Sequence, residues 1–165
     1  MKCPILIVAL VLFAQAAAAE PCTPVKIVDG DTIHFMRGTE KVKVRIAGYD
    51  APERGQELGK AATGRLKSII KDGPECNCTK LDRYGRSVCS VTVAGVDVST
   101  AMIRAGFGCI DERYTKETES KLLARNREAL AQAQAEKRGI WSDAAPICAK
   151  EYRDCLLYTS PSPRD

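Results

Sequence analysis

Histidine is almost missing from this chain of 165 residues, in which His34 is the only one. Histidine-based nucleases, Ser-His hydrolases and Cys-His proteases all need a histidine beside other reactive groups. His34 stands in the middle of an expected strand with no obvious partner, so we interpret it as structural or solvent-exposed. Any hydrolytic base in this protein is therefore expected to be a carboxylate.

Long apolar runs are missing as well, except at the very start of the chain. Lys2 is followed by an apolar stretch over residues 5–13 and an alanine-rich end at 16–19. These are the three parts of a secretory signal peptide, and the stretch is shorter than the roughly 20 apolar residues of a membrane-spanning helix. We predict a signal peptide over residues 1–19, with a membrane anchor as the alternative. The mature protein is then expected to be secreted or periplasmic, without membrane contact.

The chain also lacks low-complexity tracts, internal repeats and a strong excess of one charge. Apolar residues make up 45% and charged residues 28% of the sequence, which suits one globular domain with a core, expected over residues 20–150. The formal net charge is +4, and loss of Lys2 with the leader lowers it by one. So small a charge permits an anionic partner but would not hold nucleic acid by itself at physiological salt.

The last residues differ from the rest. Residues 156–165 show no helix or strand period and look like a translated sequencing adapter, so we expect 151–165 to be a disordered or artefactual tail. If Cys155 belongs to that tail and Cys3 leaves with the leader, six cysteines remain. An even number suits a disulfide-bonded exported protein.

The pairing of these cysteines is open at the level of sequence, apart from one local expectation. Cys76 and Cys78 share a strand face, and Cys89 lies on the next expected strand. We therefore expect one of the first two to pair with Cys89. The spacing of Cys76 and Cys78 is poor for zinc, and no second Cys/His cluster follows.

Apolar patterning predicts five short strands and three helices. The expected strands cover residues 25–28, 32–36, 42–46, 75–81 and 87–93. The expected helices cover residues 56–70, 97–105 and 116–138. A helix thus separates three strands from two, and the other helices follow. This order predicts an α+β fold, a five-stranded OB-fold β-barrel with three α-helices.

Charged residues stand on three expected turns and one strand of this pattern: Asp31, Arg45, Asp50, Glu53 and Arg86. Carboxylates hold hard cations, and guanidinium forks grip phosphate oxygens. Together the five residues could form one metal-assisted site for cutting a phosphodiester. Each one taken singly has a simpler explanation as a turn residue, a helix-entry acid or a solvent-facing arginine.

The same residues belong to sequence blocks that occur in a fixed order. The blocks are Val28-Asp29-Gly30-Asp31-Thr32, Val44-Arg45-Ile46, Asp50-Ala51-Pro52-Glu53, Asp82-Arg83-Tyr84-Gly85-Arg86 and Gly139-Ile140-Trp141. On these blocks the chain resembles the staphylococcal nuclease family, also called thermonucleases, in the form of its secreted bacterial members. The resemblance runs from about residue 25 to 141. One block would be a weak signal, but all of them in order are specific.

The resemblance implies an OB-fold endonuclease that cuts DNA and RNA with a Ca²⁺ ion. Asp31 and Asp50 correspond to its carboxylate ligands, and Ala51 would add a backbone carbonyl. The family often has threonine at that third position, but a main-chain ligand tolerates alanine. The segment after Glu53 departs from the family, because Arg54-Gly55 replaces a longer lysine-rich loop.

The resemblance also assigns the catalytic and substrate-binding roles. Arg45 and Arg86 correspond to two phosphate-binding arginines, and Glu53 to the base that activates water. Tyr84 and Tyr114 match positions that contact the nucleotide. A flexible single strand is expected to be the better substrate, because a base must stack on tyrosine. We expect a monomer.

Two other functions stay open on sequence alone. OB barrels often bind oligonucleotides without cutting them, so a non-catalytic OB-fold nucleic-acid-binding module is the first alternative. A disulfide-braced structural or inhibitory protein with a merely solvated charged face is the second. Survival of both arginines and all three carboxylates favours the nuclease over both alternatives.

Overall fold

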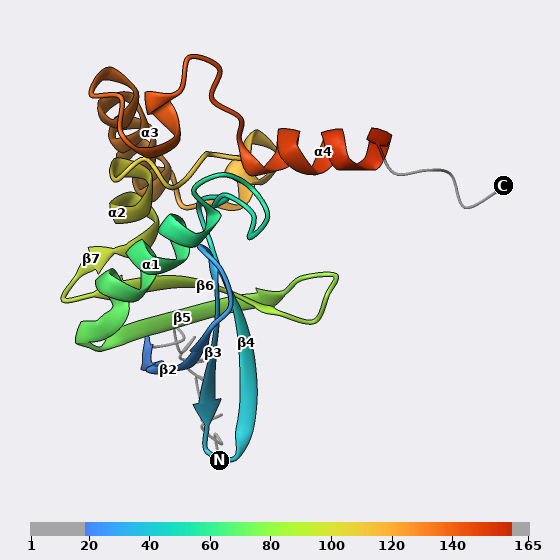
Figure 1. The fold of residues 1–165 in the computed structure, drawn as a ribbon. Helices are drawn as coiled ribbons and strands as arrows, with labels where there is room; N and C mark the ends of the chain where they lie inside the picture. Colours follow the sequence, from blue (N-terminus) through green and yellow to red (C-terminus); the bar gives the residue numbers. More distant parts are fainter. Residues whose placement is uncertain (1–18, 160–165) are drawn as a thin grey trace, which may run out of the picture.

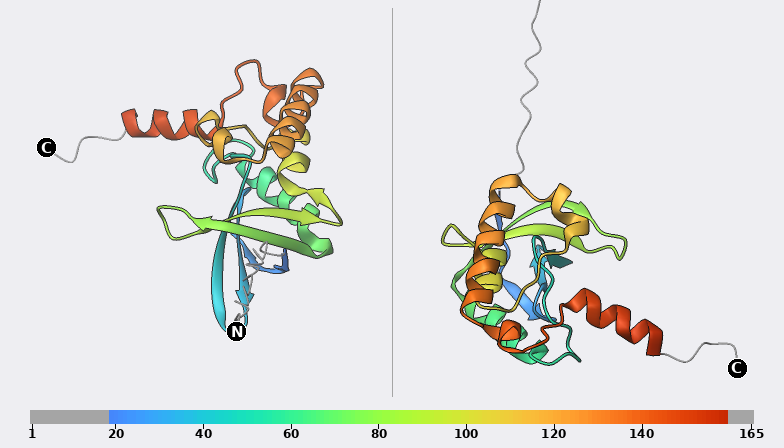
Figure 2. Two further views of the ribbon diagram at one scale, coloured as in Figure 1. Left: turned by 180° about the vertical axis from the view of Figure 1, so that it is seen from behind. Right: turned by 90° about the horizontal axis from the view of Figure 1, so that it is seen from above.

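A computed structural model describes residues 19–159 of the chain. Figure 1 shows a strongly curved sheet in which β3 and β4 cross β5 and β6. Helices α1, α2 and α3 lie along one side of the sheet, and α4 projects on the other side (Figure 2). The β3–β4 hairpin points away from the helices. The α+β class and the OB-type sheet predicted from the sequence are confirmed.

The five expected strands are present, and two very short ones are added. Their bounds are β1 Glu20–Pro21, β2 Pro24–Ile27, β3 Thr32–Arg37, β4 Glu40–Ile46, β5 Pro74–Leu81, β6 Ser87–Val93 and β7 Val96–Asp97. The strand order is β1-β5-β6-β4-β3-β2, with β7 on β6. All these pairs are antiparallel except the parallel β4–β6 pair.

The N-terminal stretch bends the sheet toward a barrel. Its first part, β1, pairs with β5, and its second part, β2, pairs with β3 at the opposite end of the strand order. Between them, the Cys22 N–H donates to the carbonyl of Pro74 at 2.9 Å. One segment therefore joins both ends of the sheet, which brings the strands around a shared core.

That core follows from the alternation of side chains along the strands. Ile33 and Phe35 of β3 and Val44 and Ile46 of β4 are buried, while the residues between them face outward. Apolar residues of the helices complete the core, among them Leu66, Met102 and Ile103. The strands are thus held by their inner face and leave the outer face of β3 and β4 free for charged residues.

Four α-helices are described where three were expected. They are α1 Gly59–Ile69, α2 Val98–Arg104, α3 Ser120–Ala135 and α4 Ala149–Thr159. Short 3₁₀ turns lie at Ile70–Asp72, Glu112–Glu117 and Gly139–Ser142. The Asp97 carboxylate caps α2 by accepting the Ser99 N–H at 2.9 Å.

Two helices begin later than predicted. A Cβ atom on Gly59 would lie 2.0 Å from the carbonyl oxygen of Glu53, so residues 54–58 turn closely around the start of α1 instead of joining it. The segment before α3 forms the 3₁₀ turn at Glu112–Glu117, and Thr118 is extended.

The six cysteines of the expected domain form three disulfides. They are Cys22–Cys76, Cys78–Cys89 and Cys109–Cys148. The second bond confirms the expectation that Cys76 or Cys78 pairs with Cys89. The first fastens the N-terminal stretch to β5, and the third fastens the start of α4 to the loop after α2. Disulfides of this kind are compatible with an oxidising compartment.

The expected chain ends have different outcomes. Apart from Ala19, the expected signal peptide lies outside the described residues. Residues 151–159, expected to belong to a disordered or artefactual tail, are part of α4, and residues 160–165 lie outside the description. None of the helices within residues 19–159 is long and apolar enough to cross a membrane.

Candidate active site

The candidate site lies where the turn before β3 meets the segment that follows β4. The Ile46 N–H donates to the carbonyl of Asp31 at 2.8 Å, and the Tyr49 hydroxyl donates to the carbonyl of Gly30 at 2.6 Å. A Cβ atom on Gly30 would lie 2.6 Å from the Cβ of Ala51. Glycine at that turn therefore allows the two segments to approach closely.

The segment after β4 is fixed from its other side as well. Asp50 and Cys109 exchange both backbone hydrogen bonds, at 2.8 and 2.9 Å. The amide of buried Asn126 on α3 donates to the carbonyl of Gly48 at 3.1 Å, and its side-chain oxygen accepts from the Thr100 hydroxyl at 2.6 Å. Helices α2 and α3 thereby hold the backbone just ahead of Asp50.

Two of the predicted carboxylates meet one predicted arginine here. Asp31 and Asp50 are only 8% and 7% exposed. The Arg45 Nη2 atom lies 3.2 Å from Asp31 Oδ2 and 3.1 Å from Asp50 Oδ1. Asp31 also accepts the Ala51 N–H at 3.1 Å and the Thr32 hydroxyl at 2.9 Å. One guanidinium thus holds both carboxylates at the end of β4.

Burial and mutual attraction shift the pKa values of Asp31 and Arg45. Burial raises the pKa of the Asp31 carboxyl, although the nearby Arg45 charge acts in the opposite direction. Burial also disfavours the Arg45 cation, but attraction from Asp31 and Asp50 outweighs it and raises the pKa of the guanidinium. A desolvated carboxylate with one shared counter-charge gains from a further cation.

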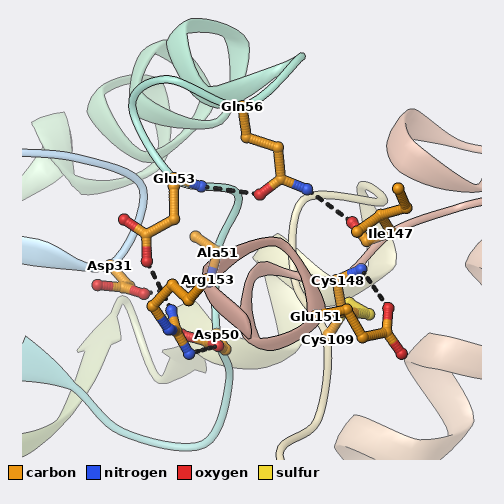
Figure 3. The surroundings of a disulfide bond; sticks show 10 residues. All are labelled: Asp31, Asp50, Ala51, Glu53, Gln56, Cys109, Ile147, Cys148, Glu151 and Arg153. Atoms are coloured by element: carbon orange, nitrogen blue, oxygen red, sulfur yellow. Dashed lines mark hydrogen bonds and ion pairs between the residues drawn. A yellow bond between two sulfur atoms is a disulfide. The ribbon is translucent and has the colours of Figure 1, made fainter. Parts of the chain in front are cut away.

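Glu53 joins the group through an arginine that the sequence did not single out. The Arg153 Nη1 atom lies 2.6 Å from Glu53 Oε1, and its Nη2 atom lies 2.7 Å from Asp50 Oδ2 (Figure 3). A longer contact of 3.4 Å joins Nη1 to Asp50 Oδ1. Burial lowers the pKa of Arg153, but its hydrogen bonds to Asp50 and Glu53 outweigh burial and raise the pKa above its ordinary value.

Helix α4 carries Arg153 to this place because its start is anchored beside Asp50. Cys148 is disulfide-bonded to Cys109, the backbone partner of Asp50, and the Cys148 N–H donates to Glu151 Oε2 at 2.9 Å (Figure 3). Arg153 is not among the predicted site residues, because the sequence predicts a tail over residues 151–165. The Lys150–Asp154 pair at i,i+4, here 2.6 Å apart, was a sequence signal for a helix at this point.

The loop of Glu53 is held by a glutamine. The Glu53 N–H donates to Gln56 Oε1 at 3.1 Å, and Gln56 Nε2 donates to the carbonyl of Ile147 at 2.6 Å (Figure 3). Gln56 therefore links this loop to the segment just before α4. The short Arg54-Gly55 connection that departs from the resembled family still leaves Glu53 next to Asp50 and Arg153.

Arg86 reaches toward the site from the β5–β6 turn. Its Nε donates to Asp82 Oδ2 at 2.7 Å, and its Nη1 lies 3.4 Å from the hydroxyl of Thr32, the neighbour of Asp31. Hydrogen bonds from Arg86 and Tyr84 lower the pKa of Asp82 although its burial acts the other way. The guanidinium thus reaches from the turn to the residue next to Asp31.

The two predicted nucleotide-contacting tyrosines are exposed, Tyr84 at 66% and Tyr114 at 55%. Tyr84 lies on the β5–β6 turn, where the guanidiniums of Arg83 and Arg86 lie 4.8 and 5.5 Å from its ring centre. Tyr114 lies on the 3₁₀ turn before α3, with Arg113 at 5.6 Å. Tyr84 is therefore linked to the predicted site through Arg86, and Tyr114 through Arg113, which lines a pocket together with Asp50.

The donor atoms suit a hard cation. No group of three or more His, Cys, Asp or Glu side chains within residues 19–159 is arranged to hold a metal ion. Asp31 and Asp50 supply two buried carboxylates, and the backbone carbonyl of Ala51 would be the third oxygen donor. An all-oxygen set of this kind fits Ca²⁺ or Mg²⁺ better than a soft metal.

Comparison with known proteins matches this chain to one family model and to several proteins named as nucleases. Residues 43–143 match the family model described as Staphylococcal nuclease homologue. A protein of Escherichia coli O157:H7, named an uncharacterized endonuclease, is 35% identical over 126 residues, which cover 74% of this chain and 78% of the relative. A micrococcal nuclease of Shigella flexneri is 30% identical over 130 residues, covering 72% of each chain. An uncharacterized endonuclease of Haemophilus influenzae is 28% identical over 151 residues, 90% of this chain and 82% of the relative.

Proposed function

Because the chain belongs to the staphylococcal nuclease family, we propose that it is a nuclease, and more specifically a secreted or periplasmic, calcium-dependent endonuclease that hydrolyses phosphodiester bonds of DNA and RNA. The observation that carries this proposal is the meeting of Asp31, Arg45 and Asp50 at the end of β4. Endonuclease names among the relatives support the reaction class.

Asp31, Asp50 and the Ala51 carbonyl would hold the cation. A bound Ca²⁺ ion supplies Lewis-acid polarisation of a phosphate oxygen. The protein contributes a fixed arrangement of the two carboxylates, since Asp31 is oriented by hydrogen bonds from Thr32 and Ala51.

Glu53 is proposed as the general base. Its carboxylate lies on the solvent side of Asp50, with a side chain 37% exposed, so a water molecule can reach it. Deprotonation or orientation of an attacking water by such a group contributes about 10²–10⁴-fold to the rate. Arg45 and Arg86 would neutralise the charge that builds up on phosphorus in the transition state.

Tyr84 and Tyr114 are proposed as stacking partners of nucleotide bases. Both rings are exposed, as a stacking platform must be. Unpaired strands are the favoured substrate, because stacking on these rings requires a base that has left a duplex.

The proposal is tested by incubating the full-length mature protein with labelled single-stranded DNA, with calcium or with a chelator. New ends are expected with calcium alone. The competing binding module predicts retained binding in chelator and no new ends under either condition, which would contradict the nuclease.

A further inference from the structure

The outer face of β4 carries a row of cations that leads to the candidate site. Lys41, Lys43 and Arg45 point outward, while Val42 and Val44 between them are buried. Residues two apart on a strand are about 6.8 Å apart, a distance close to the phosphate repeat of an extended single strand. Arg45, which holds Asp31 and Asp50, is the last cation of the row.

The row broadens across the neighbouring strands. His34 on β3 stands opposite Lys43 on one side and Lys26 of β2 on the other, and Met36 stands opposite Lys41. We call Lys26, Lys41 and Lys43 the β4 basic face. These three lysines are exposed, and none forms an ion pair with another residue of the described part of the chain.

The charges of these three lysines all act on the His34 side chain. Burial lowers the pKa of His34, and the charges of Lys41, Lys26 and Lys43 lower it further. Two acids lie at the hairpin end, and both act on Arg37: Glu20 is paired with it, and Glu40 stands opposite it in the β3–β4 register. The face therefore presents uncompensated positive charge, which is the property that a polyanion selects.

The face is continuous with the site at its upper end. Thr32 stands opposite Arg45 in the β3–β4 register, and its hydroxyl is the group that Arg86 approaches. From there β3 and β4 run out along the hairpin that points away from the helices (Figure 1). A chain bound at Arg45 and Arg86 can thus continue along this face without meeting a helix.

We propose that the β4 basic face is a binding track for the sugar-phosphate backbone of a single nucleic-acid strand whose scissile phosphate lies at Arg45. The inference rests on the proposed nuclease function and adds a substrate requirement to it. Strands long enough to reach Lys43 and Lys41 are bound more tightly than a dinucleotide, and the gain is independent of base sequence because phosphates are contacted.

The test compares the double variant Lys41→Gln/Lys43→Gln with the wild type on a dinucleotide and on a strand of about 12 nucleotides, within the span that OB-fold grooves cover. We expect KM for the longer strand to rise about 3–10-fold with kcat unchanged, while dinucleotide cleavage stays as in the wild type. The salt dependence of binding should weaken by about 1.4 in slope, for two lost contacts to a single strand.

The matched control is Lys67→Gln/Lys71→Gln, which removes the same charge from exposed lysines at the end of α1 and in the 3₁₀ turn that follows it. Equal KM values for the two double variants would overturn the track. Binding of the longer strand is also measured in chelator by fluorescence anisotropy. If the wild type cuts neither substrate but binds the strand through Lys41 and Lys43, the track stands and the nuclease assignment fails.

Discussion

The site has two walls of different construction. The barrel wall is Asp31, Arg45 and Asp50, in which each group is nearly buried and has several partners. Arg45 donates to the carbonyls of Ile46 and Tyr49 besides holding both carboxylates. The outer wall is Glu53 and Arg153, whose side chains are 37% and 39% exposed and which come from a turn and from α4.

This difference separates what is fixed from what can move. The barrel wall is set by backbone pairing between β3, β4 and the segment after them, so its geometry is part of the fold. The outer wall is held by contacts between side chains and by the anchoring of α4 through Cys109–Cys148. Four substitutions test whether the two walls differ in this way.

The largest effect is expected from the outer wall's carboxylate. Glu53→Gln should lower the cleavage rate by about 10²–10⁴-fold, because a general base is lost. Thermal unfolding should change little, since Glu53 is not part of the core. Single-turnover cleavage and circular dichroism on the same protein check both parts. Full activity in this variant would remove Glu53 from the mechanism.

A change in the barrel wall should act on stability as well as on rate. Arg45→Gln leaves two buried carboxylates without their shared counter-charge, so we expect unfolding to be easier by about 2–4 kcal/mol. Cleavage should fall by about 10²–10³-fold, as for loss of a transition-state donor. Urea denaturation measures the first effect. A variant that is inactive but as stable as the wild type would contradict the two-wall description.

Removal of Arg153, the cation of the outer wall, should have a smaller effect, and it should be a gain in calcium affinity, not a loss of activity or stability. Arg153 occupies both oxygens of Asp50, so Arg153→Gln should tighten calcium binding about 3–10-fold, the equivalent of releasing partly exposed ion pairs. Calorimetry in the absence of substrate measures it. Lys150→Gln is the matched control, because it removes one charge from the same helix without touching Asp50 or Glu53. Equal calcium affinity in the two variants would show that Arg153 does not compete.

The smallest expected effect is on the pH dependence of stability, through His34 on β3. The folded state lowers the pKa of His34, so between the ordinary value of 6.5 and the lowered value the native protein binds fewer protons than the unfolded chain. Stability is therefore complete above 6.5 and decreases as the pH falls through this window. Because His34 is the only histidine, its NMR titration is unambiguous. Lys43→Gln should bring the pKa of His34 closer to 6.5. An unchanged titration of His34 would show that the Lys43 charge does not act on it.

Much of the barrel wall could be predicted because its signals are local. The alternation in β4 and the turn at Asp29-Gly30 each follow from a few neighbouring residues. The Cys78–Cys89 bond followed from two adjacent strands. The sequence blocks then brought Asp31, Arg45 and Asp50 into one hypothesis, and the structure places these three residues in contact.

The outer wall could not be predicted, because its contacts join residues that are far apart in the sequence. Arg153 contacts Glu53 across 100 positions of sequence, and no local pattern reports such a contact. The late start of α1 depends on the close approach of Gly59 to the Glu53 carbonyl, which helical periodicity in residues 56–70 cannot reveal. Tertiary packing decided both features.

The most direct measurement of the central claim is a calorimetric titration of calcium into the wild type and Asp31→Ala, each with and without an uncleavable phosphorothioate single strand. The two-wall site predicts one ion per wild-type chain, tighter binding when the strand is present, and loss of both effects in Asp31→Ala. Calcium binding that is the same in Asp31→Ala as in the wild type would contradict it.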